Sequence, residues 1–188
     1  MEPWKTISRT EILRHSKWLK VENHTILLPN GTTLEKWPWI VTPDYVNIAV
    51  HTKDKRFLCF RQTKYAVQGT SLAPIGGYVD AGEQPLVAAR RELAEETGYA
   101  ASEWIDLGSF AVDGNHGAGQ AHLFLANGAE KQRDVVSDDL EEQEPVFLSA
   151  DELRKAIFEG QFKVLSWCAV MTLGLQYLGN TKSARSKK

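Results

Sequence analysis

Residues 77–99 read GYVDAGEQPLVAARRELAEETGY, and this stretch carries most of the information about the fold. Pro85 follows the glycines Gly77 and Gly82, and proline is tolerated in the first turn of a helix. Gly98 is a typical residue at a helix end. We therefore predict a helix over about Pro85–Thr97. Its expected inward-facing stripe consists of Leu86, Ala89, Leu93 and Thr97.

Three carboxylates fall on this predicted helix at a spacing that brings them together. Glu92, Glu95 and Glu96 lie about one turn apart. Like charges at this spacing are mutually destabilising unless something neutralises them. Hard cations such as Mg²⁺ take carboxylate oxygens together with phosphate oxygens of a substrate. A Glu-rich helix face is often simply solvated, but the glycines and Glu83 at fixed offsets favour a metal site.

The complete spacing resembles the Nudix box, position for position. Gly77 is followed after five residues by Glu83, and after seven more by Arg91 and Glu92. Chance agreement at one starting point is on the order of 10⁻⁸ from average residue usage. The resemblance implies that the Gly76 carbonyl joins Glu92, Glu95 and Glu96 in holding Mg²⁺, with Mn²⁺ as the alternative ion. It also implies that Glu83 supports this shell and that Arg91 orients the glutamates by ion pairing.

The resemblance also implies one further carboxylate that acts as a base from a loop outside the box. The acidic segment 138–144 precedes a predicted strand at Pro145–Leu148, which is the right kind of place. Glu141 is our first candidate for this base, and Glu144 is the second. The alternative is that the loop is acidic because it is solvated.

Several residues outside the box resemble the subgroup that hydrolyses ADP-ribose and nucleoside-diphosphate sugars. Arg61 precedes Gln62 at a strand end, where an arginine can grip a phosphate with two hydrogen bonds; a surface ion pair is the alternative. Aromatic residues of the N-terminal appendage stack on the nucleobase in that subgroup. The candidates here are Trp37, Trp39 and Tyr45, although for any one of them packing in the core or at an interface is the favoured explanation.

The glycine-rich loop 113–119 stands where relatives close over the diphosphate, and His116 within it is a candidate phosphate contact. Many ADP-ribose hydrolases have a proline in this loop and this sequence has none, which weakens the case for ADP-ribose specifically. His15, His24, His51 and His122 receive no role.

The remaining sequence predicts an α+β fold. Ser16–Leu28, the turn Pro29-Asn30-Gly31 and an extended run through Trp37 predict a small N-terminal antiparallel sheet. Further strands are expected at Tyr45–His51, Phe57–Phe60, Trp104–Val112, His122–Ala126 and Pro145–Leu148. Helices are expected at Asp151–Glu159, with Ser149 as N-cap, and at Leu165–Leu178. The resemblance implies a Nudix-type α/β/α sandwich with a mixed central sheet.

The expected organisation has three parts. Residues 1–42 form the appendage for dimerisation and base binding, residues 43–180 form the hydrolase domain, and residues 181–188 form a disordered basic tail. The formal net charge of −2 gives no overall basic field for nucleic acid or an anionic membrane. Two cysteines without a metal-binding spacing argue against a disulfide framework. We expect a cytoplasmic protein that forms a homodimer.

These observations predict a metal-dependent enzyme that cuts the diphosphate linkage of a nucleoside-diphosphate sugar or ADP-ribose. The products are a nucleoside monophosphate and a sugar phosphate. One alternative is a nucleoside-triphosphate pyrophosphohydrolase that clears damaged nucleotides and releases pyrophosphate. Another is a non-catalytic module that senses a nucleotide, although this chain keeps all four glutamates of the box.

Overall fold

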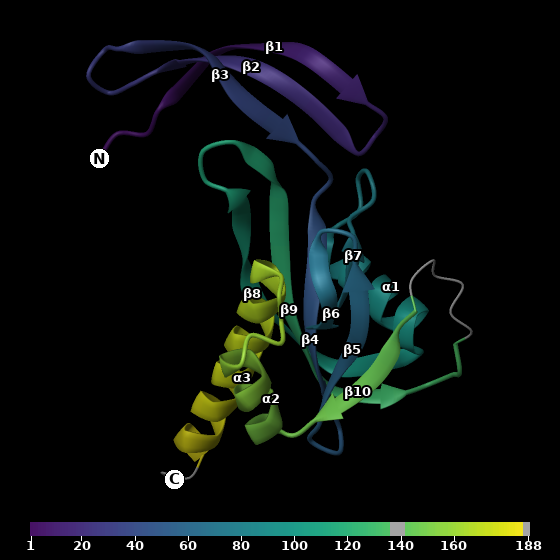
Figure 1. Cartoon of the computed structure of the whole chain (residues 1–188). Coiled ribbons are helices and arrows are strands. Elements are labelled where there is room, and N and C mark those ends of the chain that lie inside the picture. Colours follow the sequence, from purple (N-terminus) through teal and green to yellow (C-terminus); the bar gives the residue numbers. More distant parts are fainter. Residues whose placement is uncertain (136–141, 186–188) are drawn as a thin grey trace. The chain divides into compact units, whose positions relative to one another are not determined.

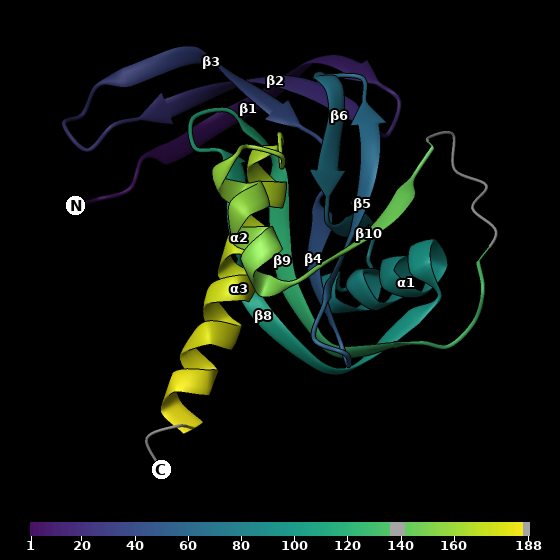
Figure 2. The same ribbon diagram turned by 60° about the horizontal axis from the view of Figure 1, so that its bottom comes forward.

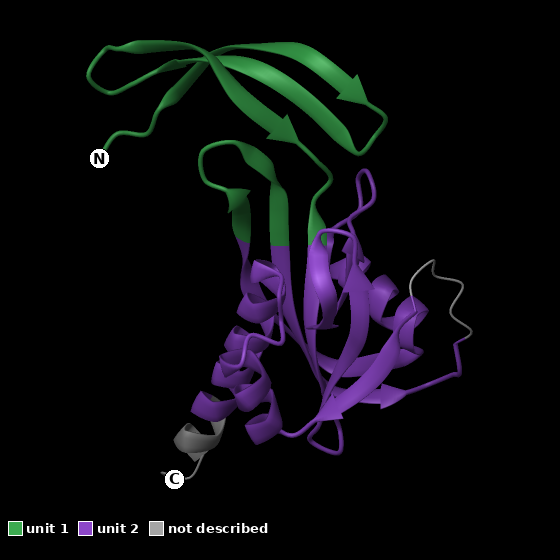
Figure 3. Cartoon of the chain, in the orientation of Figure 1, with its two compact units in different colours: residues 1–45, 110–121 green, residues 46–109, 122–188 purple. Residues whose placement is uncertain are grey.

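The computed structural model describes residues 1–135 and 142–185 and groups the chain into two compact units (Figure 3). The first unit contains residues 1–45 and 110–121, and the second contains residues 46–109 and 122–188. Residues 110–121 therefore join the N-terminal unit, although they lie within the stretch expected to form the hydrolase domain. Within the described residues, none of the helices has the length and apolar character needed to cross a bilayer.

The first unit is built on three antiparallel strands, β1 (Lys5–His15), β2 (Leu19–Leu27) and β3 (Thr33–Val41), as Figure 1 shows. The predicted Asn30–Gly31 turn joins β2 to β3, with Gly31 at φ +85° and Asn30 Oδ1 accepting from Thr32 N at 3.0 Å. Strand β1 was not predicted. All of its residues are exposed, so it has no buried alternating face that a sequence pattern can reveal.

The expected strand start at Ser16 is wrong, because Ser16 has φ +57° and the β1–β2 turn occupies this position. The tips of two long strands complete the unit. These strands are β8 (Tyr99–Asp113) and β9 (Gly117–Lys131), both longer than the sequence predicted. Strand β9 pairs in parallel with β3 through Gly117 and Ile40. The loop 114–116 is thereby attached to the N-terminal sheet.

The second unit contains the mixed sheet of the predicted sandwich. Its strands run in the order β9, β4 (Tyr45–Thr52), β5 (Phe57–Lys64) and β10 (Glu144–Leu148). Strands β6 (Val67–Ala73) and β7 (Ile75–Tyr78) pair with β5 and β4, and β8 pairs with β9. Neither β6 nor β7 was predicted as a separate strand, because short runs rich in Gly, Pro and Ser read as turns.

Helices cover both faces of this sheet, as Figure 2 shows. Helix α1 (Pro85–Thr97) packs its Ala88, Ala89 and Leu93 on Val46, Ile48 and Val50 of β4. On the other face, helix α3 (Leu165–Arg185) brings Gly174 so close to Ala49 that an added Cβ would lie 2.8 Å from the alanine Cβ. The α+β sandwich predicted from the sequence is confirmed.

Two helix predictions need correction. Leu86 is 37% exposed and does not belong to the inward face of α1, which Ala88 occupies instead. Helix α3 continues to Arg185, so part of the expected disordered tail is helical. The residues Thr181–Arg185 include Lys, Ala and Arg, which propagate a helix well, and contain no Gly or Pro to stop it. Residues 186–188 lie outside the described range.

Helix α2 (Ala150–Phe158) begins where the sequence predicted. The Ser149 hydroxyl accepts from Glu152 N, and the Glu152 carboxylate accepts from Ser149 N at 2.7 Å, which completes a capping box.

Candidate active site

Helix α1 presents its polar face because its apolar face is fixed on the sheet. Ala88, Ala89 and Leu93 are completely buried, and Arg91, Glu92 and Glu96 reach the strand and loop that precede the helix. Gly98 ends the helix with φ +72°, and its N–H donates to Ala94 O at 3.1 Å. The sequence therefore fixes both the rotation and the end of the helix that carries the glutamates.

Arg91 is the centre of a charged network. Its Nε donates to Glu83 Oε1 at 3.1 Å and its Nη2 donates to Glu83 Oε2 at 2.9 Å. Its Nη1 donates to Glu92 Oε1 at 2.7 Å and to Glu95 Oε2 at 3.2 Å. Nη2 also reaches the Tyr78 carbonyl at 3.1 Å. The predicted ion pairing of Arg91 with the glutamates is present.

Glu83 ties the turn before α1 to this network. Its carboxylate also accepts from Asp80 N at 3.1 Å, which fixes the loop between Gly77 and the helix. The hydrogen bonds from Arg91 hold the pKa of Glu83 below its ordinary value. Glu83 is therefore an anionic brace between the loop and Arg91.

Glu92 is the most enclosed carboxylate of the network, and its side chain is 13% exposed. Burial raises its pKa, and the neighbouring Arg91 opposes that rise. The carboxylate lies against Gly77, where an added Cβ would come within 2.2 Å of Glu92 Oε1. Gly77 is thus required because a Glu92 oxygen occupies the space of a side chain.

Glu96 approaches the same segment one residue earlier. Gly76 N donates to Glu96 Oε2 at 3.3 Å. On its other side, Gly76 packs on β4, where an added Cβ would lie 2.2 Å from the Val46 carbonyl oxygen. The two glycines therefore let the backbone of β7 lie between β4 and two carboxylates of α1.

The two glycines make a testable contrast. Gly77→Ala is expected to lower the melting temperature only slightly, because its added Cβ meets the carboxylate end of the Glu92 side chain and no backbone atom. Its kcat/KM should fall by about 10- to 100-fold, since displacing a carboxylate that orients a site has effects of this size. Gly76→Ala should instead lower the melting temperature, because its Cβ meets backbone. An equal decrease in melting temperature in both variants would contradict the distinction between a side-chain contact at Gly77 and a backbone contact at Gly76.

The oxygen donors at this place suit a hard cation. Glu92, Glu95 and Glu96 supply carboxylates, and the backbone at Gly76 lies beside Glu96. In the part of the chain that the structure describes, no three acidic, His or Cys side chains form a ready-made cage. Mg²⁺ does not require one, because it keeps several waters and takes one or two carboxylates together with substrate phosphates. The donor set fits such an ion.

Arg61, the candidate phosphate contact, and Glu144, the second candidate for the loop base, lie on neighbouring strands. Arg61 on β5 pairs in register with Glu144 on β10, and Arg61 Nε lies 3.6 Å from Glu144 Oε2. Both side chains are largely exposed, which makes this a loose ion pair. Glu141, the first candidate for the base, lies outside the described residues.

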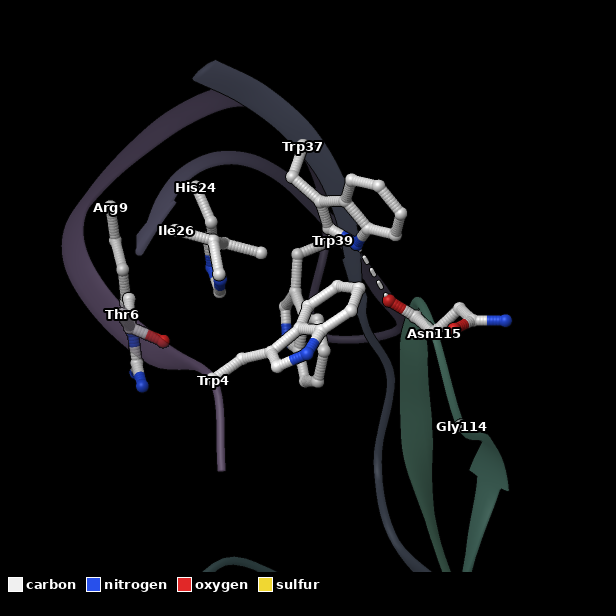
Figure 4. Close-up of a pocket in the computed structure, with 9 residues that line it drawn as sticks. All are labelled: Trp4, Thr6, Arg9, His24, Ile26, Trp37, Trp39, Gly114 and Asn115. Atoms are coloured by element: carbon white, nitrogen blue, oxygen red, sulfur yellow. Dashed lines mark hydrogen bonds between the residues drawn. The ribbon is translucent and has the colours of Figure 1, made fainter. Parts of the chain in front are cut away.

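Two of the three predicted aromatic residues, Trp37 and Trp39, line one pocket of the first unit, and Tyr45 does not line it (Figure 4). Trp37 Nε1 donates to the Asn115 carbonyl at 2.8 Å, and its ring stacks on His116 with centroids 6.0 Å apart. Asp113 accepts from the backbone N–H groups of Asn115 and His116 and from His116 Nδ1 at 3.2 Å. His116 is thus held beside Trp37 by its own loop.

Trp39 is packed against two neighbours. Its ring stacks on buried His24 with centroids 5.1 Å apart. Its Cε2 and Cζ2 atoms lie against Gly117, where an added Cβ would come within 2.7 Å of the indole. Trp39 therefore forms part of the floor of this unit, and a base stacked on the face that His24 covers would have to displace the histidine.

A pocket of about 310 Å³ opens beside these aromatics, close to the lower end of the ~300–1,000 Å³ typical of small-molecule sites. Five of its nine residues were not predicted to form a site: Trp4, Thr6, Arg9, His24 and Ile26. Trp4 is 52% exposed and meets Trp37 edge to face at 5.8 Å. It precedes an unrecognised strand, so no pattern separated it from a disordered N-terminus.

Two models of known protein families match this chain. Residues 41–168 match the family model of the NUDIX domain. The chain belongs to the Nudix family. Residues 4–40 match the nucleoside diphosphate sugar hydrolase N-terminal domain, and together the two matches place this Nudix chain in the subgroup of ADP-ribose and nucleoside-diphosphate-sugar hydrolases. It is a hydrolase acting on pyrophosphate bonds.

Curated relatives span nearly the whole Nudix chain. It is 27% identical to the ADP-ribose pyrophosphatase of Bacillus subtilis over 98% of this chain and 97% of that protein. It is 27% identical to a methanol dehydrogenase activator of Bacillus methanolicus over 97% of this chain and 96% of that protein. It is 28% identical to the CMP-5'-(N-acetyl-N-hydroxy-3-aminopropyl)phosphonate hydrolase of Streptomyces rubellomurinus over 91% of this chain and 82% of that protein.

A solved structure described as an ADP compounds hydrolase confirms the Nudix fold. The two chains superpose with a TM-score of 0.79 over 96% of this chain and 97% of the other, at 17% identity. Nudix hydrolases generally use divalent metal ions, which agrees with the oxygen donors around Glu92 and Glu96.

Proposed function

We propose that the chain hydrolyses the diphosphate linkage of a nucleoside-diphosphate sugar or ADP-ribose in a Mg²⁺-dependent reaction. The products are a nucleoside monophosphate and a sugar phosphate. The observation that carries the proposal is the convergence of Glu92 and Glu96 on the backbone at Gly76 and Gly77, braced by Arg91. The full-length similarity to an ADP-ribose pyrophosphatase supports the choice of substrate class.

Each residue of the box has a distinct part in this proposal. Glu92, Glu95, Glu96 and the Gly76 carbonyl hold the cation. When bound, Mg²⁺ would offset the charge on the oxygen of the attacking water and on the leaving oxygen of the diphosphate. Arg91 and Glu83 position the carboxylates and do not touch substrate, because their donors and acceptors are already paired with each other.

Arg61 contacts a phosphate, and a carboxylate of the loop removes a proton from the attacking water. We propose Glu141 for this base and Glu144 as the second candidate. Glu144 is already close to Arg61, so a phosphate that binds Arg61 would compete with the 3.6 Å ion pair and release the carboxylate.

The first unit binds the nucleobase in this proposal. The exposed indole of Trp4 and the pocket edge of Trp37 offer aromatic surface, while Trp39 supports the floor. His116, held beside Trp37, contacts the phosphate end of the nucleoside. We further propose a homodimer, because β1 is an edge strand that exposes the apolar side chains of Ile7, Ile12 and Leu13. Two free cysteines agree with a reducing cytoplasm.

Product analysis tests this function. Purified protein is incubated with Mg²⁺ and a panel of ADP-ribose, ADP- and GDP-sugars, dinucleoside polyphosphates and nucleoside triphosphates. Products are then separated by anion-exchange chromatography. We expect monophosphate plus sugar phosphate from a nucleoside-diphosphate sugar or ADP-ribose. Pyrophosphate released from triphosphates, with the diphosphate sugars left intact, would overturn the proposal in favour of a triphosphate pyrophosphohydrolase.

A further inference from the structure

Arg9 is the unmatched charge of the pocket in the first unit. It stands on β1 with Thr6, on the opposite side of the pocket from Trp4 and Trp37 (Figure 4). Arg9 makes no hydrogen bond or ion pair with any residue in the described ranges 1–135 and 142–185, and its side chain lines the cavity. An unpaired guanidinium at a pocket wall is available to a ligand.

The other charged groups nearby are already matched. Glu22 accepts from Lys20 Nζ at 2.6 Å and pairs with His24 Nε2 at 2.8 Å on the buried face of β2. Those partners hold the pKa of Glu22 below its ordinary value. Arg14, farther along β1, is paired with Glu11. The pocket therefore has one uncompensated cation, and that cation is Arg9.

The polar groups of the wall favour a ligand that accepts hydrogen bonds. A guanidinium carries five N–H donors and no acceptor. The indole N–H of Trp37 is already donated to Asn115 O, and His24 Nε2 is held by Glu22. Arg9 therefore supplies the only charged open donors opposite the exposed ring of Trp4 among the residues that line the pocket, beside the hydroxyl of Thr6, which can donate or accept.

Guanine and adenine differ in whether they can accept two hydrogen bonds from the guanidinium group of Arg9. Guanine presents two acceptors side by side, O6 and N7, which an arginine contacts with two hydrogen bonds. Adenine presents N7 beside an amino group that is itself a donor, so its N–H and the guanidinium N–H would oppose each other. Strands β1 and β3 are separated by one strand, or about 10 Å, which leaves room for a planar base between Arg9 and the tryptophans.

We infer that Arg9 is a specificity-determining residue that reads the carbonyl edge of the base, so that the preferred substrate carries guanine and not adenine. This inference rests on the proposed function, because it assigns the pocket to the nucleoside end of the diphosphate substrate. It departs from the adenine base named for the Bacillus subtilis relative. The relative that acts on a CMP conjugate carries a different base again.

Binding of the nucleoside monophosphates GMP and AMP to the full chain tests Arg9 without requiring hydrolysis. Isothermal titration calorimetry measures both dissociation constants for the wild type, Arg9→Met and Arg14→Met. Arg14 is the matched control, since it lies on the same exposed strand but does not line the pocket. We expect the wild type and Arg14→Met to bind GMP about tenfold or more tightly than AMP. In Arg9→Met the ratio should fall to about one, with an unchanged melting temperature.

Three results would overturn the inference: tighter binding of AMP by the wild type, a GMP preference that survives in Arg9→Met, or no binding of either nucleotide. Hydrolysis of GDP-glucose and ADP-glucose is measured in parallel. If the wild type binds GMP selectively but cleaves neither sugar nucleotide, the proposed reaction fails while the assignment of Arg9 stands. If both are cleaved equally and neither monophosphate is distinguished, the reaction stands and the assignment of Arg9 fails.

Discussion

Glu96→Gln is expected to fold like the wild type and to lose about 10²- to 10³-fold in kcat/KM, a loss typical of removing one preorganised electrostatic group. The substitution keeps the shape of the side chain, and the amide oxygen can still accept from Gly76 N, which lies 3.3 Å from Glu96 Oε2. It removes the negative charge that a cation requires. Steady-state hydrolysis at saturating Mg²⁺, together with calorimetric melting, measures both effects.

Mn²⁺ binding followed by electron paramagnetic resonance separates a lost metal site from a general loss of activity. Glu96→Gln should bind Mn²⁺ more weakly than the wild type. The control is Glu130→Gln, because Glu130 pairs with Lys53 on the exposed surface of the same unit. That variant should match the wild type in hydrolysis and Mn²⁺ binding. Unchanged turnover in Glu96→Gln would show that Glu96 is not a metal ligand.

Gly98→Ala is expected to give the largest loss of stability among single-methyl additions in the second unit. Gly98 has φ +72°, a region that costs other residues about 1–2 kcal/mol. Its added Cβ would also lie 2.1 Å from the Arg133 carbonyl oxygen, so backbone must move. We expect a total cost of about 2–4 kcal/mol, or a melting temperature about 5–15 °C lower.

Gly160→Ala is the matched control for this prediction. Gly160 also has a positive φ, +69°, but an added Cβ meets nothing within 4 Å. Its substitution therefore reports the backbone strain alone. Differential scanning calorimetry of both variants should show the smaller shift for Gly160→Ala. Equal shifts would mean that the contact between Gly98 and the Arg133 carbonyl contributes nothing measurable.

The box segment was predictable because several local constraints agree there. Pro85 starts α1, Gly98 ends it, and the spacing of Glu92 and Glu96 fixes which side carries charge. Even so, the apolar stripe was only partly right. Leu86 lies in the first turn and is exposed, whereas small Ala88 allows the helix to approach the sheet. Periodicity alone cannot decide which edge of an apolar stripe is buried.

The first unit was harder to predict because long-range pairing forms it. Strand β1 has no buried residue, so its extended conformation depends on hydrogen bonding to β2. Trp4 and Arg9 consequently had no recognisable place, although both line the pocket. Loop 114–116 belongs to this unit through Gly117 and Ile40, a contact between residues far apart in the chain. No local pattern encodes such a contact.

The most direct test of diphosphate hydrolysis at α1 is phosphorus NMR of a reaction with GDP-glucose or ADP-ribose, started with Mg²⁺ and then treated with a chelator. We expect the diphosphate signals to disappear as two phosphate monoester signals grow, and chelation to stop the conversion at once. Diphosphate signals that persist in the presence of Mg²⁺ and folded protein, or a conversion that continues after chelation, would contradict it.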